Sequence, residues 1–170
     1  PIYFDRAELG DQWHAASDAW RIVDGQAAGE NARNAGLWLN LPLPDKVRIE
    51  FTAQSLSDEG DLKFEVFTDG RTHESGYIGI FGGWSNSLNI IARRDEHGDD
   101  RLIGAEGRRV ERGRVYQFRI ERTDARLRWF VDGQPFLTYT DPQPLVGDAH
   151  RHFGFNDWAA PVRFDNFRVY

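Results

Sequence analysis

The sequence predicts an all-β protein whose antiparallel strands form a two-sheet sandwich. Three observations support this prediction: strand-like runs are short and frequent, turn residues separate them, and most of them alternate apolar with polar side chains. The chain shows no internal repeat and no linker, so we expect a single domain over residues 1–170. A domain of this length buries roughly 70% of the surface of its unfolded chain, which is enough for one core.

Twelve segments have the composition of strands, and one has a helical character. The helical segment is 5–14, where Asp5 can cap a first turn and Glu8 follows three residues later. We therefore expect at most one short helix, close to the N-terminus. The expected strands are residues 2–4, 20–23, 37–39, 46–53, 61–67, 77–81, 87–93, 116–122, 126–131, 134–139, 152–155 and 162–169.

Turn residues predict three tight hairpins. Asp132-Gly133 stands between two alternating runs, and this dipeptide is a strong hairpin signal. Asp24-Gly25 repeats the arrangement near the N-terminus, and a third turn at residues 122–126 contains Asp124. The three runs between residues 116 and 139 should therefore be consecutive antiparallel neighbours.

Alternation assigns the side chains of each strand to two faces. In the segment 46–53, Arg48 and Glu50 lie opposite the apolar residues, and in 61–67 Lys63 and Glu65 do so. We therefore expect one face of each sheet to be buried and the other to be polar, charged and dotted with aromatic residues. The apolar sets are Val47, Ile49, Phe51 and Ala53; Leu62, Phe64 and Val66; Tyr116, Phe118 and Ile120; and Leu127, Trp129 and Val131.

Composition excludes some functions and leaves the compartment open. The net charge of −6 argues against a nucleic-acid partner, and no apolar run approaches the length that crosses a bilayer. Without cysteine, disulfides give no information on location, and we favour a periplasmic or extracellular one. Without methionine, Pro1 is expected to be the end of a processed or excised chain. The oligomeric state is left open.

Five segments together carry a resemblance to a known superfamily. They read DRAELGDQW, WRIVDGQA, VRIEFTAQSLSDEGDLKFEVF, YQFRIERTDARLRWFVDGQPFLTYTD and VRFDNFRVY. The chain resembles the concanavalin A-like jelly-roll superfamily, and within it the laminin-G-like modules and the 3-keto-disaccharide hydrolase domains of bacteria. This resemblance implies a jelly-roll sandwich with an oligosaccharide or polysaccharide as partner. The catalytic strand patterns of the hydrolases in this superfamily are absent, so no catalytic residue is carried over.

An aromatic and amide set is the main candidate for a ligand site. Sugar rings stack their C–H groups on aromatic faces, and their hydroxyls pair with amides, carboxylates and guanidinium groups. Trp84 lies in a turn rich in glycine, where few neighbours can cover it. The candidate residues are Trp84, Asn86, Asn89 and Arg93 from this turn and the strand after it, and Asn156 and Trp158 from a second turn. The other four tryptophans, Trp13, Trp20, Trp38 and Trp129, are interpreted as core residues.

Glu50 and Glu65 are the candidate catalytic carboxylates, with His152 as a further candidate. If their consecutive strands pair, the two carboxylates share one face, and a retaining glycosidase needs a separation of about 5 to 5.5 Å. The alternative is an ion-pair lattice in which Arg48 and Lys63 alternate with the two glutamates on a solvated sheet.

A metal site is possible in the charged segment that follows. Asp95, Glu96, His97 and Asp99 could bind calcium, which requires six to eight oxygen ligands. Neighbouring arginines can neutralise these acids without a metal, so no cofactor is expected. Zinc or manganese held by Glu96, His97 and His152 is a further alternative.

Three functions remain open. The first is a carbohydrate-binding, lectin-like module without catalysis. The second is a glycoside-cleaving hydrolase or lyase of the 3-keto-disaccharide hydrolase type. The third is an adhesive module that binds another protein through a flat surface.

Overall fold

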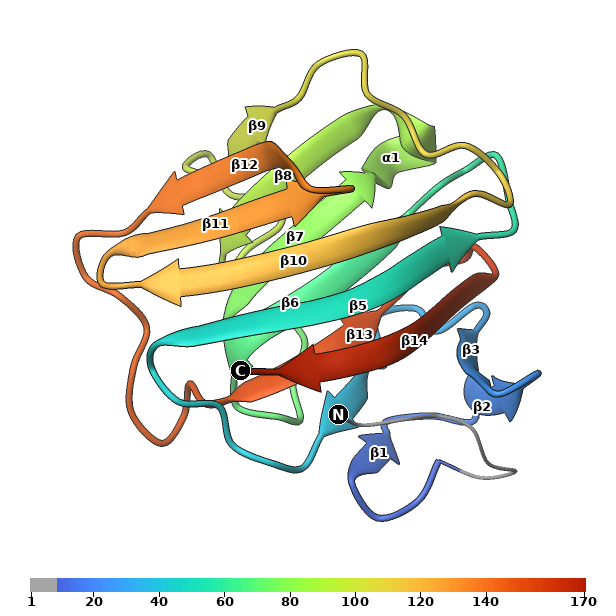
Figure 1. Cartoon of the computed structure of the whole chain (residues 1–170), viewed down its shortest axis with the longest axis horizontal. Coiled ribbons are helices and arrows are strands. Elements are labelled where there is room, and N and C mark those ends of the chain that lie inside the picture. Colours follow the sequence, from blue (N-terminus) through green and yellow to red (C-terminus); the bar gives the residue numbers. More distant parts are fainter. Residues whose placement is uncertain (1–8) are drawn as a thin grey trace.

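Two antiparallel sheets of seven strands each pack face to face in the computed structural model, which describes residues 9–170 (Figure 1). Sheet I has the strand order β1-β4-β13-β6-β7-β8-β9, and sheet II has the order β12-β11-β10-β5-β14-β3-β2. A four-residue helical turn, α1 (Gly83–Asn86), connects β7 to β8. The strands are β1 (Trp13–Ala15), β2 (Trp20–Val23), β3 (Gln26–Gly29), β4 (Leu37–Leu39), β5 (Val47–Ser55), β6 (Leu62–Thr68), β7 (Tyr77–Gly82), β8 (Leu88–Arg93), β9 (Leu102–Gly104), β10 (Val115–Thr123), β11 (Arg126–Val131), β12 (Gln134–Thr140), β13 (His152–Asn156) and β14 (Val162–Val169).

The prediction of an all-β, two-sheet sandwich is confirmed. Every predicted strand that lies within the described residues is present, and the ends move by two residues at most. The sequence reading missed three short strands, β1, β3 and β9. The predicted strand at 2–4 lies outside the described residues, as does the first part of the predicted helix at 5–14. The last part of that helix prediction is wrong, because Trp13 and His14 belong to β1.

The three predicted hairpins are also confirmed. Asp24 and Gly25 connect β2 to β3, and Asp132 and Gly133 connect β11 to β12. All four residues have positive φ, between 52° and 78°, as the turns whose twist matches antiparallel strands require. Asp124, with φ 52°, turns the chain between β10 and β11.

Strands β5 and β6 do not pair, so the condition under which Glu50 and Glu65 would share one face is not met. Strand β5 lies in sheet II between β10 and β14, whereas β6 lies in sheet I between β13 and β7. The chain crosses from one layer to the other between them. Glu50 and Glu65 are therefore on the outer faces of different sheets, on opposite sides of the sandwich.

Aromatic rings fill the space between the sheets. Phe51 of β5 lies at their centre, with its ring centroid 5.3 Å from that of Phe118 in sheet II and 5.1 Å from that of Phe155 in sheet I. Phe155 in turn stacks on Phe164 of β14 at 4.3 Å. Because such ring pairs add to the free energy of burial, this aromatic centre joins the two layers.

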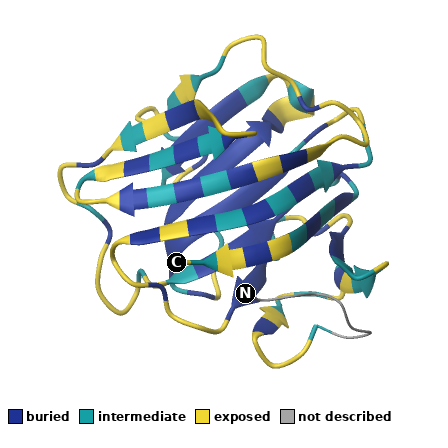
Figure 2. Ribbon diagram, viewed as in Figure 1, coloured by how far each residue is buried: buried dark blue, intermediate teal, exposed yellow. Residues whose placement is uncertain are grey.

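The outer faces of the two sheets differ in burial (Figure 2). Along β5, β10 and β11 of sheet II, buried residues alternate with exposed or half-buried ones. In sheet I, every residue of β6 and β7 is buried, so the predicted polar and open face is wrong for this sheet. A second apolar cluster lies there, formed by Ile78, Ile80, Ile90 and Ala92.

Trp38 belongs to this outer layer of sheet I. It is buried, but it is absent from the central cluster that contains Trp13, Trp20 and Trp129, which were correctly assigned to the core. A Cβ on Gly154, its partner in the sheet, would lie 2.4 Å from the Trp38 ring. Only glycine therefore lets this ring lie flat across β13.

Candidate functional site

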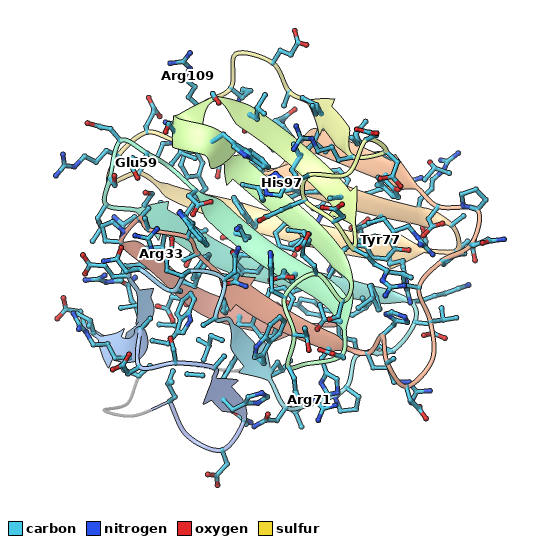
Figure 3. All side chains as sticks on the ribbon, turned by 180° about the vertical axis from the view of Figure 1, so that it is seen from behind. Arg33, Glu59, Arg71, Tyr77, His97 and Arg109 are labelled. Carbon is cyan, nitrogen blue, oxygen red and sulfur yellow. The ribbon has the colours of Figure 1, made fainter. Side chains whose placement is uncertain are left out.

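A pocket of about 420 Å³ opens beside α1 on the outer side of sheet I. This volume falls within the range of about 300–1,000 Å³ found for small-molecule sites. Figure 3 looks onto this side and labels Glu59 and His97, two residues of the pocket. The pocket is lined by Asn34, Glu59, Asp61, Lys63, Ile80, Gly83, Trp84, Ser85, Glu96, His97, Trp158, Ala159 and Ala160.

Two exposed tryptophans form walls of this pocket. Trp84 is 37% exposed and Trp158 is 48% exposed, and they come from turns that are far apart in the sequence. Exposed tryptophan is uncommon, because its large apolar surface is usually buried. Two of them at one pocket form an aromatic surface that a flat, partly apolar ligand can contact.

Trp84 is held by an uncommon backbone conformation. Trp84, Ser85 and Asn86 have φ of 50°, 57° and 60°, in the left-handed region that costs about 1–2 kcal/mol per residue. The Asn86 side chain stabilises the turn by donating to the carbonyl oxygens of Asp58 and Val110 and by accepting the Val110 N–H at 2.9 Å. Such strain, held in place by the surrounding structure, is typical of functional sites.

Trp158 is fixed through its backbone. Its N–H donates to Asp61 Oδ2 at 2.8 Å, and its carbonyl oxygen accepts the N–H of Arg33 at 2.9 Å. The guanidinium of Arg33 lies 4.8 Å from the centre of the Trp158 ring. On the other wall, Arg101 lies 4.9 Å from the centre of the Trp84 ring. Each tryptophan is therefore stacked with one arginine.

Lys63 and Glu96 form the polar floor of the pocket. The Lys63 ammonium is nearly buried, donates to Asn34 Oδ1 at 2.7 Å and lies 3.2 Å from Glu96 Oε2. Burial alone would raise the pKa of Glu96, but the hydrogen bond from His73 and the charges of Lys63 and His73 outweigh burial and lower this pKa to about 2. Glu96 is therefore ionised at neutral pH.

His73 connects this floor to a buried glutamate behind it. Its Nδ1 lies 2.9 Å from Glu65 Oε2, and its Nε2 lies 3.3 Å from Glu96 Oε1. Burial favours the neutral imidazole, but the hydrogen bonds and charges of Glu65 and Glu96 raise the pKa of His73 to about 9. Asn156 Nδ2 donates to the same Glu65 oxygen at 2.6 Å. The result is a buried chain of alternating charges from Lys63 to Glu65.

Two aspartates meet beside Trp158. Asp157 is fully buried, and its Oδ2 accepts the N–H of Ala32 at 3.5 Å. Burial raises the pKa of Asp157, and the charge of Asp61 raises it further, to about 8. Asp157 is therefore protonated at neutral pH.

The structure brings together some of the predicted ligand residues and separates the others. Trp84 and Trp158 line one pocket, and Asn156 lies in the charge network behind it. Asn86 and Asn89 use their amides on backbone groups, with Asn89 Oδ1 accepting the N–H of Gly82 and its Nδ2 donating to two carbonyl oxygens. The geometry therefore gives these two amides a structural role in holding loops.

Three other predicted residues lie away from the pocket. Arg93 donates to Asp141 Oδ2 at 2.8 Å, at the opposite end of β8 from α1. His152 bonds through Nδ1 to the carbonyl oxygen of Leu39. Glu50 lies on sheet II, 3.7 Å from Arg48 on its own strand. The predicted lattice of Arg48, Glu50, Lys63 and Glu65 does not form, since its members are in different sheets.

The predicted metal ligands have separate partners. Glu96 pairs with Lys63 and His73, His97 lies edge-on to Trp84 at 5.5 Å, and Asp95 accepts the N–H of His97. Within residues 9–170, no group of three or more histidine, aspartate or glutamate side chains is placed to hold a metal ion. No helix in this part of the chain is long and apolar enough to span a membrane.

Sequence reasoning missed most of the polar lining. Asn34, Glu59 and Asp61 were not candidates, and Lys63 was assigned to a solvated lattice. Glu59 and Asp61 flank Gly60, in the connection between the two sheets, and this glycine with φ 72° marks a tight turn. That turn was the only local sign of these residues in the sequence. The pocket is lined by five segments that are distant in the sequence, and no sequence pattern shows that they meet.

Comparisons with known proteins identify the fold. No protein-family model matches the sequence, and no curated protein sequence matches it significantly. A carbohydrate-binding module, CBM66, from Bacillus subtilis matches the structure with a TM-score of 0.75 at 14% identity, over 95% of this chain and 97% of that chain. The carbohydrate recognition domain of Emp47p matches with a TM-score of 0.68 at 11% identity, over 98% of this chain and 91% of that chain. A sialidase matches with a TM-score of 0.68 at 11% identity, over 94% of this chain but 17% of that chain.

These matches establish a lectin-like jelly-roll sandwich of the concanavalin A-like and galectin-like type. They do not single out the laminin-G-like or 3-keto-disaccharide hydrolase domains. At identities of this order, likeness carries the fold alone.

Proposed function

We propose that this protein is a carbohydrate-binding module and that its ligand binds in the pocket between Trp84 and Trp158. The observation that carries the proposal is that two exposed tryptophans line the same pocket as the polar side chains of Lys63, Glu96 and Asn34. Sugars present C–H faces and hydroxyl edges together, and this pocket offers matching groups for both. A pocket of this shape favours a glycan over a flat protein contact.

The proposal is tested on a glycan array of neutral and acidic oligosaccharides, followed by calorimetry. We expect Trp84→Ala to weaken binding of the best ligand at least tenfold, which corresponds to about 1.4 kcal/mol. Trp158→Ala should have a similar effect, because both rings form walls of the same pocket.

A matched control is available on sheet II. Tyr170 is also an exposed aromatic residue that stacks with an arginine, with Arg48 4.2 Å from its ring centre. Tyr170→Ala should leave the affinity unchanged. Absence of binding to every glycan, or the same affinity in Trp84→Ala and in the unaltered protein, would overturn the proposal.

A glycoside-cleaving enzyme, of the 3-keto-disaccharide hydrolase type suggested by the resemblance, is the second candidate. The observation in its favour is that an ionised carboxylate, Glu96, lines the pocket, while a carboxyl with a raised pKa, Asp157, lies buried behind it. Glycoside hydrolysis uses carboxyl groups with pKa values moved apart in this way. Turnover of a bound glycoside that is lost in Glu96→Gln supports the enzyme, and tight binding without turnover supports the module.

A further inference from the structure

The charges beneath the pocket are already balanced. Lys63 lies 3.2 Å from Glu96, and His73 bridges Glu96 and Glu65 at 3.3 and 2.9 Å. These are two cations and two carboxylates, all nearly buried. Lys63 also uses a second donor on Asn34 Oδ1. The floor therefore has no spare positive charge with which to hold an anionic ligand.

Two arginines stack on the tryptophans of the pocket. Arg33 stacks on Trp158 and Arg101 stacks on Trp84, and neither of them is among the residues that line the cavity. Arg101 Nη1 also donates to the carbonyl oxygen of Glu96 at 2.8 Å. Both guanidinium groups are thus engaged with the tryptophan rings, and that of Arg101 also with a backbone carbonyl.

The charged groups that line the pocket without an ion pair are acidic. Asp61 and Glu59 both face it, and neither forms an ion pair with any residue in the described range 9–170. Behind Asp61, the fully buried Asp157 adds a second carboxyl, whose Oδ1 has no hydrogen-bond partner among residues 9–170. The lining groups that remain free to bind a ligand, the carboxylates of Asp61 and Glu59, are therefore hydrogen-bond acceptors.

We infer that the pocket selects uncharged sugars over sugars that carry a carboxylate. This inference rests on the proposed carbohydrate-binding function. A neutral sugar brings hydroxyl donors, which Asp61 and Glu59 can accept. A carboxylate brings only acceptors, meets like charge at these two residues and finds no unpaired cation to compensate for its lost hydration.

Matched pairs of methyl glycosides provide the test. The glucose, galactose and mannose members are each compared with the corresponding uronic acid, which differs only in a carboxylate in place of the C6 hydroxymethyl group. Calorimetry at pH 7 and low ionic strength should show the acidic member of any pair that binds to be at least tenfold weaker. Equal or tighter binding of the acidic member overturns the inference and leaves the proposed function intact. Absence of binding by all six compounds and by the glycan array overturns the proposed function as well.

Asp61→Asn and Glu59→Gln test the source of the discrimination. Asparagine keeps an oxygen that can accept the Trp158 N–H and removes the charge. Each variant should reduce the ratio of neutral to acidic affinity at least threefold, by improving the binding of the acidic sugar. Glu111→Gln is the matched control, since it removes an exposed carboxylate that pairs with Arg114 and is absent from the pocket lining. A ratio that is the same in Asp61→Asn, Glu59→Gln and Glu111→Gln overturns the inference.

Discussion

The outer faces of the two sheets carry similar alternating sequences but have different environments. On sheet II, Arg119 lies 3.2 Å from Glu121 on β10, and both side chains are partly exposed to solvent (Figure 2). On sheet I, Lys63 and Glu65 hold equivalent positions on β6, and both are buried. The difference comes from the loops, because segments that contain Asn34, His73 and Glu96 cover sheet I.

This comparison shows how the same residue types acquire different physical roles. Charges on an open sheet remain hydrated, so their pairing contributes little to stability. Charges under a cover lose their hydration and depend on their partners, and this shifts the pKa values of His73 and Glu96. The covered face is also the face with the pocket, so the buried charges and the proposed ligand site belong to one sheet.

Glu65→Ala should have the largest effect. The substitution removes the carboxylate that pairs with His73 Nδ1 and accepts the shorter hydrogen bond of Asn156, so that His73 is left with its hydrogen bond to Glu96 and the Asn156 amide with that to the Asn34 carbonyl oxygen. Loss of one member of a buried ion pair costs about 3–5 kcal/mol. Urea denaturation should show a loss of this size in the free energy of unfolding. A loss below about 1 kcal/mol would mean that the covered network contributes no more than an open one.

The pH dependence of stability should be the second effect. The pKa of His73 is raised to about 9 from about 6.5 in an unfolded chain, so its contribution is fully present below pH 6.5 and is lost as pH rises through 9. The raised pKa of Asp157 acts in the same direction between about pH 4 and pH 8. Urea midpoints should therefore fall between pH 6.5 and pH 9, with His73 contributing at most about 3 kcal/mol.

The contribution of His73 is separated by substitution. His73→Gln should flatten the decline between pH 6.5 and pH 9, whereas His97→Gln, which alters an exposed ring, should keep the original slope. If His73→Gln keeps the same slope as the unaltered protein, the imidazole is not the group that titrates.

Glu50→Ala should have the smallest effect. Glu50 lies on the open face of sheet II, 3.7 Å from an exposed Arg48. Pairs of this kind contribute about 0–1 kcal/mol, so the free energy of unfolding should change by less than about 1 kcal/mol. Urea denaturation of Glu50→Ala and Glu65→Ala compares directly how much a glutamate on the open face and a glutamate on the covered face contribute to the free energy of unfolding. Equal losses in the two variants would remove the distinction between the faces.

Local signals in the sequence explain why the fold was predictable. The Asp-Gly turns at residues 24 and 132 work through nearest neighbours, since only these residue types adopt the required positive φ at low cost. Alternation in β5, β10 and β11 also depends on local geometry. The short strands β1, β3 and β9 were missed, although β2 and β4 of similar length were found, because β1 overlaps the predicted helix, β3 reads QAAG without a β-branched or aromatic residue, and β9 lies in the charged segment after β8.

The candidate site was predictable only in part. Trp84 was chosen because the turn residues around it indicated exposure, and Trp158 because it stands beside Asn156 in a second aromatic and amide set; both line the pocket. Asn86 and Asn89 were chosen by type alone, and their amides bind backbone groups. Glu50 and Glu65 do not share one face, because their consecutive strands belong to different layers of the sandwich.

The sequence by itself determined most of the strands, the hairpins and the core faces of most strands. These properties depend on residues within a few positions of one another. The tertiary structure alone decided which strands share a sheet, which outer face is covered and which charges are buried. It also decided that Asp61, Lys63 and Glu96 meet at one pocket, because contacts between distant segments depend on how the loops close over the sheet.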